Sequence, residues 1–149
     1  MEIKPLDQCR EYEELVVQWL WKEFGNEKNY KRYEMIIRHS MDPDNLPQTF
    51  VAMKEGRAVA TVGLWRCDLM SRQDLFPWLA SLYVDPAYRH RGIGKKLQQF
   101  ILDYCKKQQY SKVYLYTDLV NYYEKTGWEQ LDYGWTEDME KVRIYQYKL

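Results

Sequence analysis

The chain has 149 residues, 46% hydrophobic and 30% charged, a composition typical of one soluble globular domain, so residues 1–149 are expected to form a single domain. The 22 basic and 22 acidic residues balance, which argues against a nucleic-acid binder that works through bulk positive charge. No apolar run approaches the roughly 20 residues of a membrane span, and the charged N-terminus lacks the apolar segment of a signal peptide.

The cysteines indicate a reducing environment. Cys9, Cys67 and Cys105 are odd in number and widely spaced, and His39 and His90 are the only histidines beside them. This set favours neither a disulfide framework nor a zinc site. We therefore expect a cytoplasmic protein without a bound metal.

The first 40 residues predict an edge strand and two helices. Residues 3–6 form a short strand interrupted by Pro5, and Asp7 is placed to cap the helix that follows. Apolar side chains at helical spacing continue to residue 20, and this helix ends near Gly25. A second helix spans residues 30–40 and is closed by Asp42 and Pro43.

A hairpin and a polar loop come next. Residues 48–53 and 57–65 read as antiparallel strands joined by a tight turn at Gly56. Residues 66–76 form a polar loop, and a mostly apolar strand then runs to Val84 and is ended by Asp85 and Pro86.

The strand to Val84 leads into a basic turn and a helix that reaches about Gln109. Gly92 and Gly94 let the backbone approach a bulky ligand, and Arg89, Arg91 and Lys95 add positive charge. The first turn of a helix also leaves about four N–H groups unpaired at the positive end of its dipole. This stretch therefore predicts an anion site, the alternative being an ordinary strand-to-helix turn with solvated basic residues.

The remaining elements complete a mixed sheet. Residues 113–117 form a strand parallel to the one ending at Val84, followed by a short helix over 118–126 that Gly127 stops. Residues 128–133 and 142–147 form closing strands. The fold class is α/β, with the element order β-α-α-β-β-β-α-β-α-β-β and helices on both faces of the sheet.

Two segments carry a resemblance to a known family. Arg89-x-x-Gly92-x-Gly94 resembles the acyl-CoA pyrophosphate loop of the GNAT superfamily of N-acyltransferases. The segment from Asn121 to Trp128 resembles that family's Tyr-Glu-Lys-x-Gly-Phe/Trp segment after the next strand, and the element order matches the GNAT fold. One departure is Thr117, where many members have an asparagine that touches the pantetheine arm of CoA.

The resemblance implies an acetyl-CoA site. Backbone groups at the strand end would pair with the pantetheine amides, and the amides of the basic turn would hold the pyrophosphate. A strand amide near Leu82 would also face the thioester carbonyl and stabilise the oxyanion that develops there. The residues that this implies are Leu82, Tyr83 and Val84 on the strand, Arg89, His90, Arg91, Gly92, Ile93, Gly94 and Lys95 in the turn, and Thr117, Tyr122 and Tyr123 beyond the next strand.

The resemblance also implies catalysis by Tyr123. Tyr123 matches the family's usual general acid, which would protonate the departing CoA sulfur as the C–S bond breaks. The expected function is an N-acetyltransferase that moves an acetyl group from acetyl-CoA to a primary amine by direct transfer in a ternary complex. The alternatives are a buried packing role for Tyr123, one of 14 tyrosines, and a non-catalytic acyl-CoA-binding module.

The general base is left open by the sequence. Family members often carry a glutamate on the central strand, but residues 77–84 contain no acidic residue. The candidates are Asp68 and Asp74 in the loop before that strand, His39, and water that carries the proton away.

The acceptor is predicted only by class. Aromatic and acidic residues would suit a cationic amine such as a polyamine, an aminosugar or a peptide amine, although each is as readily explained by core packing or solvation. The sequence leaves open whether two copies form a homodimer. The residues concerned are Trp19, Trp21, Tyr30, Tyr33, Trp65, Trp78, Trp128 and Trp135, with Asp42, Asp44, Asp68, Asp74, Glu137 and Asp138.

Overall fold

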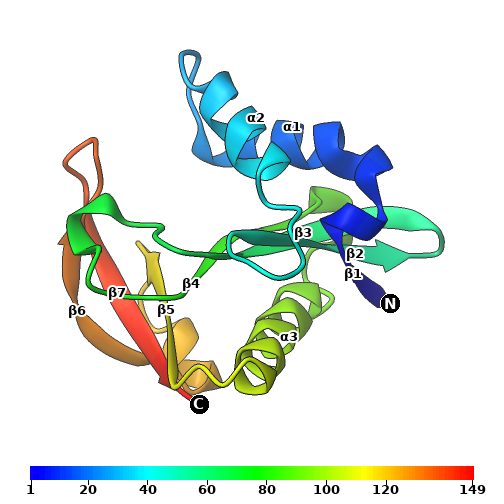
Figure 1. The fold of residues 1–149 in the computed structure, drawn as a ribbon. Helices are drawn as coiled ribbons and strands as arrows, with labels where there is room; N and C mark the ends of the chain where they lie inside the picture. The colour runs from blue at the N-terminus through cyan, green and yellow to red at the C-terminus, as the bar shows by residue number, and fades with distance from the viewer. The chain divides into compact units, whose positions relative to one another are not determined.

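The computed structural model describes residues 1–149 and contains one seven-stranded mixed sheet, in the order β1-β2-β3-β4-β5-β7-β6 (Figure 1). The strands are β1 (Glu2–Pro5), β2 (Gln48–Lys54), β3 (Arg57–Trp65), β4 (Trp78–Val84), β5 (Lys112–Thr117), β6 (Glu129–Trp135) and β7 (Lys141–Lys148). The α-helices are α1 (Glu13–Phe24), α2 (Tyr30–Arg38) and α3 (Ile93–Lys107).

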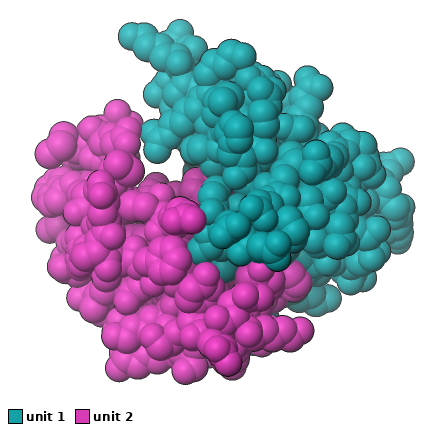
Figure 2. All heavy atoms as spheres, viewed as in Figure 1, with its two compact units in different colours: residues 1–64, 81–99 teal, residues 65–80, 100–149 magenta.

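The chain folds into two compact units, which Figure 2 colours separately. Unit 1 comprises residues 1–64 and 81–99, and unit 2 comprises residues 65–80 and 100–149. The boundaries fall within β3, β4 and α3, so each of these elements contributes to both units.

Unit 1 is built on the predicted hairpin. β2 and β3 pair antiparallel, and Glu55 and Gly56 take φ angles of 52° and 76° in the turn between them. This left-handed pair matches the twist of the two strands, which explains the glycine. β1 adds antiparallel to β2 as the edge strand. In Figure 1, α1 and α2 lie above these strands and the start of α3 lies below them.

The predicted cap at Asp7 is wrong. Asp7 lies inside a 3-10 turn (Leu6–Gln8), and a second turn (Arg10–Tyr12) separates it from α1. The backbone bonds from Cys9 N–H to the Leu6 carbonyl and from Tyr12 N–H to the Cys9 carbonyl, both 3.0 Å, hold these turns. Local backbone bonding therefore replaces the side-chain cap, and α1 begins at Glu13.

Unit 2 contains the parallel contact and the closing strands. β4 pairs parallel with β5, with Trp78 opposite Tyr114, and β7 lies antiparallel between β5 and β6. Trp78 and Ile144 are fully buried in its core, together with the less completely buried Leu69 and Val142. The parallel pairing confirms the predicted strand–helix–strand unit.

The short helix expected over residues 118–126 is wrong. The structure has a single 3-10 turn, η5 (Tyr123–Thr126), which Gly127 ends at φ 95° as expected. Before it, Leu119 N–H bonds the Thr117 hydroxyl at 3.0 Å and Asn121 takes φ 57°, so the backbone leaves the helical region. The observed element order is β-α-α-β-β-β-α-β-β-β.

The buried face of α3 includes a polar residue, since Gln98 is 3% exposed and lies beside the buried Leu97 and Leu102 along the helix. Phe100 and Tyr104 are half-buried and stack on each other with ring centroids 6.4 Å apart. No helix of the chain combines the length and the apolar character that a membrane span requires.

Candidate active site

The loop after β4 is shaped by Asp85 and by two left-handed residues. Asp85 N–H bonds the Val59 carbonyl at 2.9 Å, and its carboxylate accepts a 2.9 Å bond from Ala87 N–H that starts a 3-10 turn. His90 and Gly92 then take φ angles of 64° and 80°. This backbone path brings the chain directly into the first turn of α3.

The start of α3 has the form of an anion cradle. The bond from Lys96 N–H to the Gly92 carbonyl, 3.1 Å, is an i to i−4 helical bond, so the amides of Ile93, Gly94 and Lys95 precede it. A Cβ atom added to Gly92 would meet no heavy atom within 4 Å. Backbone amides beside open space at a helix N-terminus fit a phosphate-bearing ligand such as CoA.

The two arginines of the loop lie against tyrosine rings. Arg89 Nε donates to the Val84 carbonyl at 2.8 Å, and its guanidinium lies 5.5 Å from the centre of the Tyr83 ring. Arg91 lies 5.5 Å from the Tyr88 ring centre. Arg89 therefore helps to hold the end of β4, while Lys95 is exposed at the helix start.

The end of β4 holds the residues expected to meet the pantetheine arm. Leu82, Tyr83 and Val84 are half-buried, and the Tyr83 ring packs 5.3 Å from Trp19 of α1, where burial raises the pKa of its phenol. Ser81 takes φ 53° and breaks the regular strand conformation just before them. No residue pattern in β4 predicts this irregularity, because serine carries no preference for positive φ.

Tyr123 is a buried phenol in unit 2. Its side chain is 9% exposed and lies among three rings, with centroid distances of 4.9 Å to Tyr122, 6.1 Å to Trp128 and 6.0 Å to Tyr145. Burial, with a smaller contribution from Tyr122, raises its pKa to about 12. Next to it, the Tyr145 hydroxyl donates to Glu124 at 3.1 Å. The phenol is thus fully protonated at neutral pH.

Two other predicted cofactor residues, Thr117 and Tyr122, belong to the same unit. Thr117 ends β5 and lies directly opposite Arg143 of β7, and its hydroxyl accepts the Leu119 amide bond. Tyr122 is 48% exposed. The structure therefore groups Thr117, Tyr122 and Tyr123 in unit 2 and the residues from Leu82 to Lys95 in unit 1.

Asp74 is poorly suited to act as a base. Arg72 donates to both of its carboxylate oxygens at 2.9 Å and also reaches Asp132 of β6 at 3.1 Å. This hydrogen bonding to Arg72 lowers the pKa of Asp74. Asp68 is half-buried in the same loop, and His39 is exposed at the end of α2, which is in unit 1.

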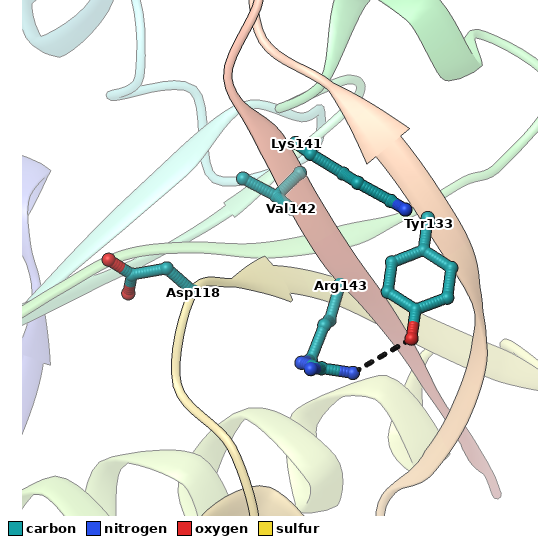
Figure 3. Close-up of a pocket in the computed structure, with 5 residues that line it drawn as sticks. All are labelled: Asp118, Tyr133, Lys141, Val142 and Arg143. Carbon is teal, nitrogen blue, oxygen red and sulfur yellow. Dashed lines mark hydrogen bonds between the residues drawn. The ribbon is translucent and has the colours of Figure 1, made fainter.

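A hollow of about 300 Å³ in unit 2 holds residues that sequence analysis did not single out (Figure 3). It is lined by Asp118, Tyr133, Lys141, Val142 and Arg143. Lys141 Nζ lies 4.3 Å from the Tyr133 ring centre, and Arg143 donates to the Tyr133 hydroxyl at 3.0 Å. The sequence does carry a signal for Lys141 and Arg143 as a pair, because alternate residues of a strand project from the same face.

Most of the tryptophans that were candidates for binding the acceptor amine are packed in the protein core. Trp19, Trp65, Trp78 and Trp128 are buried. Trp21 instead closes the loop between α1 and α2, with its indole N–H donating to the Asn26 carbonyl at 2.6 Å. Among the tryptophans only Trp135, on β6, is exposed. Burial in the core, the alternative weighed for each tryptophan, is thus correct for four of them.

A family model, described as the acetyltransferase (GNAT) family, matches residues 14–128 of the chain. No curated protein sequence matches the chain. An aminoglycoside 6'-acetyltransferase type Ii is 15% identical with a TM-score of 0.73, and covers 99% of this chain and 97% of its own. An aminoglycoside 6'-N-acetyltransferase complexed with coenzyme A is 14% identical with a TM-score of 0.72 at the same coverage of 99% and 97%. A GNAT-family acetyltransferase from Staphylococcus aureus Mu50 is 22% identical with a TM-score of 0.70, and covers 99% of both chains. At these identities the structures show that the fold is shared.

Proposed function

The chain belongs to the acetyltransferase (GNAT) family, and from this premise we propose that it acetylates a primary amine by direct transfer from acetyl-CoA, with Tyr123 as the general acid. As a family member it is an acetyltransferase that acts with acetyl-CoA. The proposal adds the amine acceptor, the ternary complex and the residues that perform each step.

The first turn of α3 supports the donor site. The amides from Arg89 to Lys95, with His90 and Gly92 in left-handed conformations, would hold the CoA pyrophosphate, and Lys95 would add positive charge. The backbone of Leu82, Tyr83 and Val84 would pair with the pantetheine amides. The Leu82 amide would face the thioester carbonyl as an oxyanion donor, and Thr117 and Tyr122 would line the arm.

The burial of Tyr123 is the single observation that carries the catalytic assignment. With a pKa of about 12 the phenol holds its proton at neutral pH, so its hydroxyl can donate a hydrogen bond to the sulfur on which negative charge develops as the C–S bond breaks. When the amine nitrogen bonds to the acetyl carbon and the C–S bond breaks, Tyr123 gives its proton to the departing sulfur and is then reprotonated from solvent. The amine's own proton leaves through water or through Asp68, because Arg72 already occupies the Asp74 carboxylate.

The test is a thiol-release assay with acetyl-CoA and a panel of primary amines. Tyr123→Phe removes only the hydroxyl, so we expect kcat to fall about 100-fold or more while CoA affinity stays near normal. Tyr110→Phe is the matched control, because Tyr110 lies on the loop after α3 and packs against Phe76. If the Tyr123→Phe enzyme keeps the wild-type kcat, the hydroxyl is not a general acid and Tyr123 has only a packing role.

The assay also separates catalysis from a non-catalytic acyl-CoA-binding module. The engagement of Asp74 by Arg72 favours that alternative, since it removes one candidate base. If CoA binds tightly and no amine accelerates thiol release, the binding module is the better description.

The family match from residue 14 to 128 runs through both units, which supports a single catalytic domain over residues 1–149. All three cysteines are free thiols, as a reducing cytoplasm would keep them. The acceptor is a small molecule or a peptide amine, and sedimentation would decide whether two copies form a homodimer.

A further inference from the structure

The hollow of Figure 3 carries charges of opposite sign. Lys141 and Arg143 reach it from β7, Tyr133 lies beside them on β6, and Asp118 lies on the side of the hollow away from Tyr133. A volume of about 300 Å³ suits a small ligand.

The two cations are positioned by uncharged groups. Arg143 donates to the Tyr133 hydroxyl at 3.0 Å and to the Gln130 side-chain oxygen at 3.4 Å. Lys141 Nζ and the Arg143 guanidinium lie 4.3 and 5.3 Å from the same Tyr133 ring centre. These contacts fix the position of both charges without neutralising them, so both are available to an anion.

The strand register connects the hollow to the proposed general acid. Arg143 and Tyr145 are two residues apart on β7, so their side chains leave the same face of the strand. The Tyr145 ring lies 6.0 Å from that of Tyr123, and Thr117 is the β5 partner of Arg143. Along β7, Arg143 therefore lies about one strand repeat, roughly 7 Å, from Tyr145, whose ring contacts Tyr123, and Lys141 lies about two repeats, roughly 14 Å, from it.

We propose that the acceptor is an amine that also carries a carboxylate or phosphate, that Lys141 and Arg143 bind this anionic group, and that Asp118 faces the ammonium. The inference rests on the proposed acetyl transfer and narrows its substrate class. It differs from the purely cationic amine that the acidic and aromatic residues of the sequence suggested.

The experiment compares amines in pairs that differ in the anionic group. O-phosphoethanolamine is paired with ethanolamine, and β-alanine with β-alaninamide, so the two arms distinguish phosphate from carboxylate. Wild-type enzyme is expected to favour an anionic member by about tenfold or more in kcat/KM, as loss of a charge-assisted contact implies.

The double variant Lys141→Gln/Arg143→Gln should lose this preference through KM, with CoA affinity and ethanolamine turnover unchanged. Lys148→Gln removes a cation from the far end of β7 and should keep the preference. Lys141→Arg should retain it as well. Equal activity on both members of each pair, a preference that survives the double variant, or weakened CoA binding in that variant would overturn the inference.

Failure of the proposed function is a separate result, in which no amine accelerates CoA release. Calorimetric titration of the CoA-bound protein with O-phosphoethanolamine and with ethanolamine still decides the inference in that case. Binding of the phosphorylated amine alone, lost in the double variant, supports it, and binding of neither overturns it.

Discussion

Gly92 shows how one residue can be required by conformation and by function together. Its φ of 80° disfavours any side chain by about 1–2 kcal/mol, and the space beside it is open. Gly56, in the β2–β3 turn, has φ 76° and the same open surroundings, so the two glycines share the conformational cost but not the proposed ligand.

Gly92→Leu should therefore weaken CoA binding about tenfold or more, because a side chain would occupy the path of the pyrophosphate. Both Gly92→Leu and Gly56→Leu should lower the free energy of unfolding by about 1–2 kcal/mol, but Gly56→Leu should leave CoA affinity unchanged. Calorimetric titration with CoA measures the affinities and urea unfolding measures the stabilities. Normal CoA affinity in Gly92→Leu contradicts the phosphate-loop assignment.

At the scale of elements, the turn between α1 and α2 depends on Gly25. A Cβ added there would lie 2.6 Å from the Trp21 carbonyl oxygen and 2.7 Å from the Asn29 side-chain oxygen, and the first of these is backbone. We expect Gly25→Ala to lower the free energy of unfolding by about 1–3 kcal/mol in urea titrations.

Gly94→Ala is the matched control for Gly25→Ala. A Cβ on Gly94 meets only Val84 Cγ2, at 3.9 Å, and alanine favours the helix by up to about 1 kcal/mol over glycine. A stability change of the same sign in both variants would show that the backbone contact at Gly25 is not the cause.

The Cys105 thiol, buried on α3, should make the free energy of unfolding fall as the pH becomes alkaline. Burial raises the pKa of the Cys105 thiol from 9.0 to about 12. The unfolded chain therefore releases this proton first, and folding free energy is lost by up to about 1.4 kcal/mol per pH unit as pH rises between these two values.

Cys105→Ala should remove this contribution. The stability advantage of wild type over the variant should shrink as pH rises above about 9, as followed by urea unfolding at several pH values. Cys67→Ala, at a half-buried thiol outside α3, is the control. A constant difference between wild type and Cys105→Ala across this range would contradict the assignment.

At the scale of the whole molecule, direct transfer requires the donor and acceptor to be bound together. Cys9 and Cys105 are buried, so neither is available as an acyl carrier. Initial-velocity lines for acetyl-CoA and amine should intersect rather than run parallel, and mass spectrometry after incubation with acetyl-CoA alone should show no acetylated enzyme. Parallel lines together with an acetylated Cys67 would contradict the ternary complex and indicate transfer through an acyl-enzyme intermediate on Cys67.

Most elements could be predicted from the sequence because their signals are local. Helical spacing located α1, α2 and α3, Gly56 marked the hairpin, and Gly127 marked the stop after η5. The predicted cap at Asp7 and the predicted helix over residues 118–126 were wrong because short turns with local hydrogen bonds replaced them, and such turns lack the apolar spacing that marks a regular helix. The left-handed Ser81 had no sequence signal at all.

The sequence by itself determined the family, and it supplied the hypotheses of a glycine-containing anion loop and of Tyr123 as general acid, since each lies in a contiguous motif. The tertiary structure alone decided the environment of each group: the burial that raises the Tyr123 pKa, the ion pair of Arg72 with Asp132 of β6, and the contact of Lys141 and Arg143 with the Tyr133 ring of the neighbouring strand. Burial and ion pairing depend on segments far apart in the chain, and a local pattern carries no information about which of them meet.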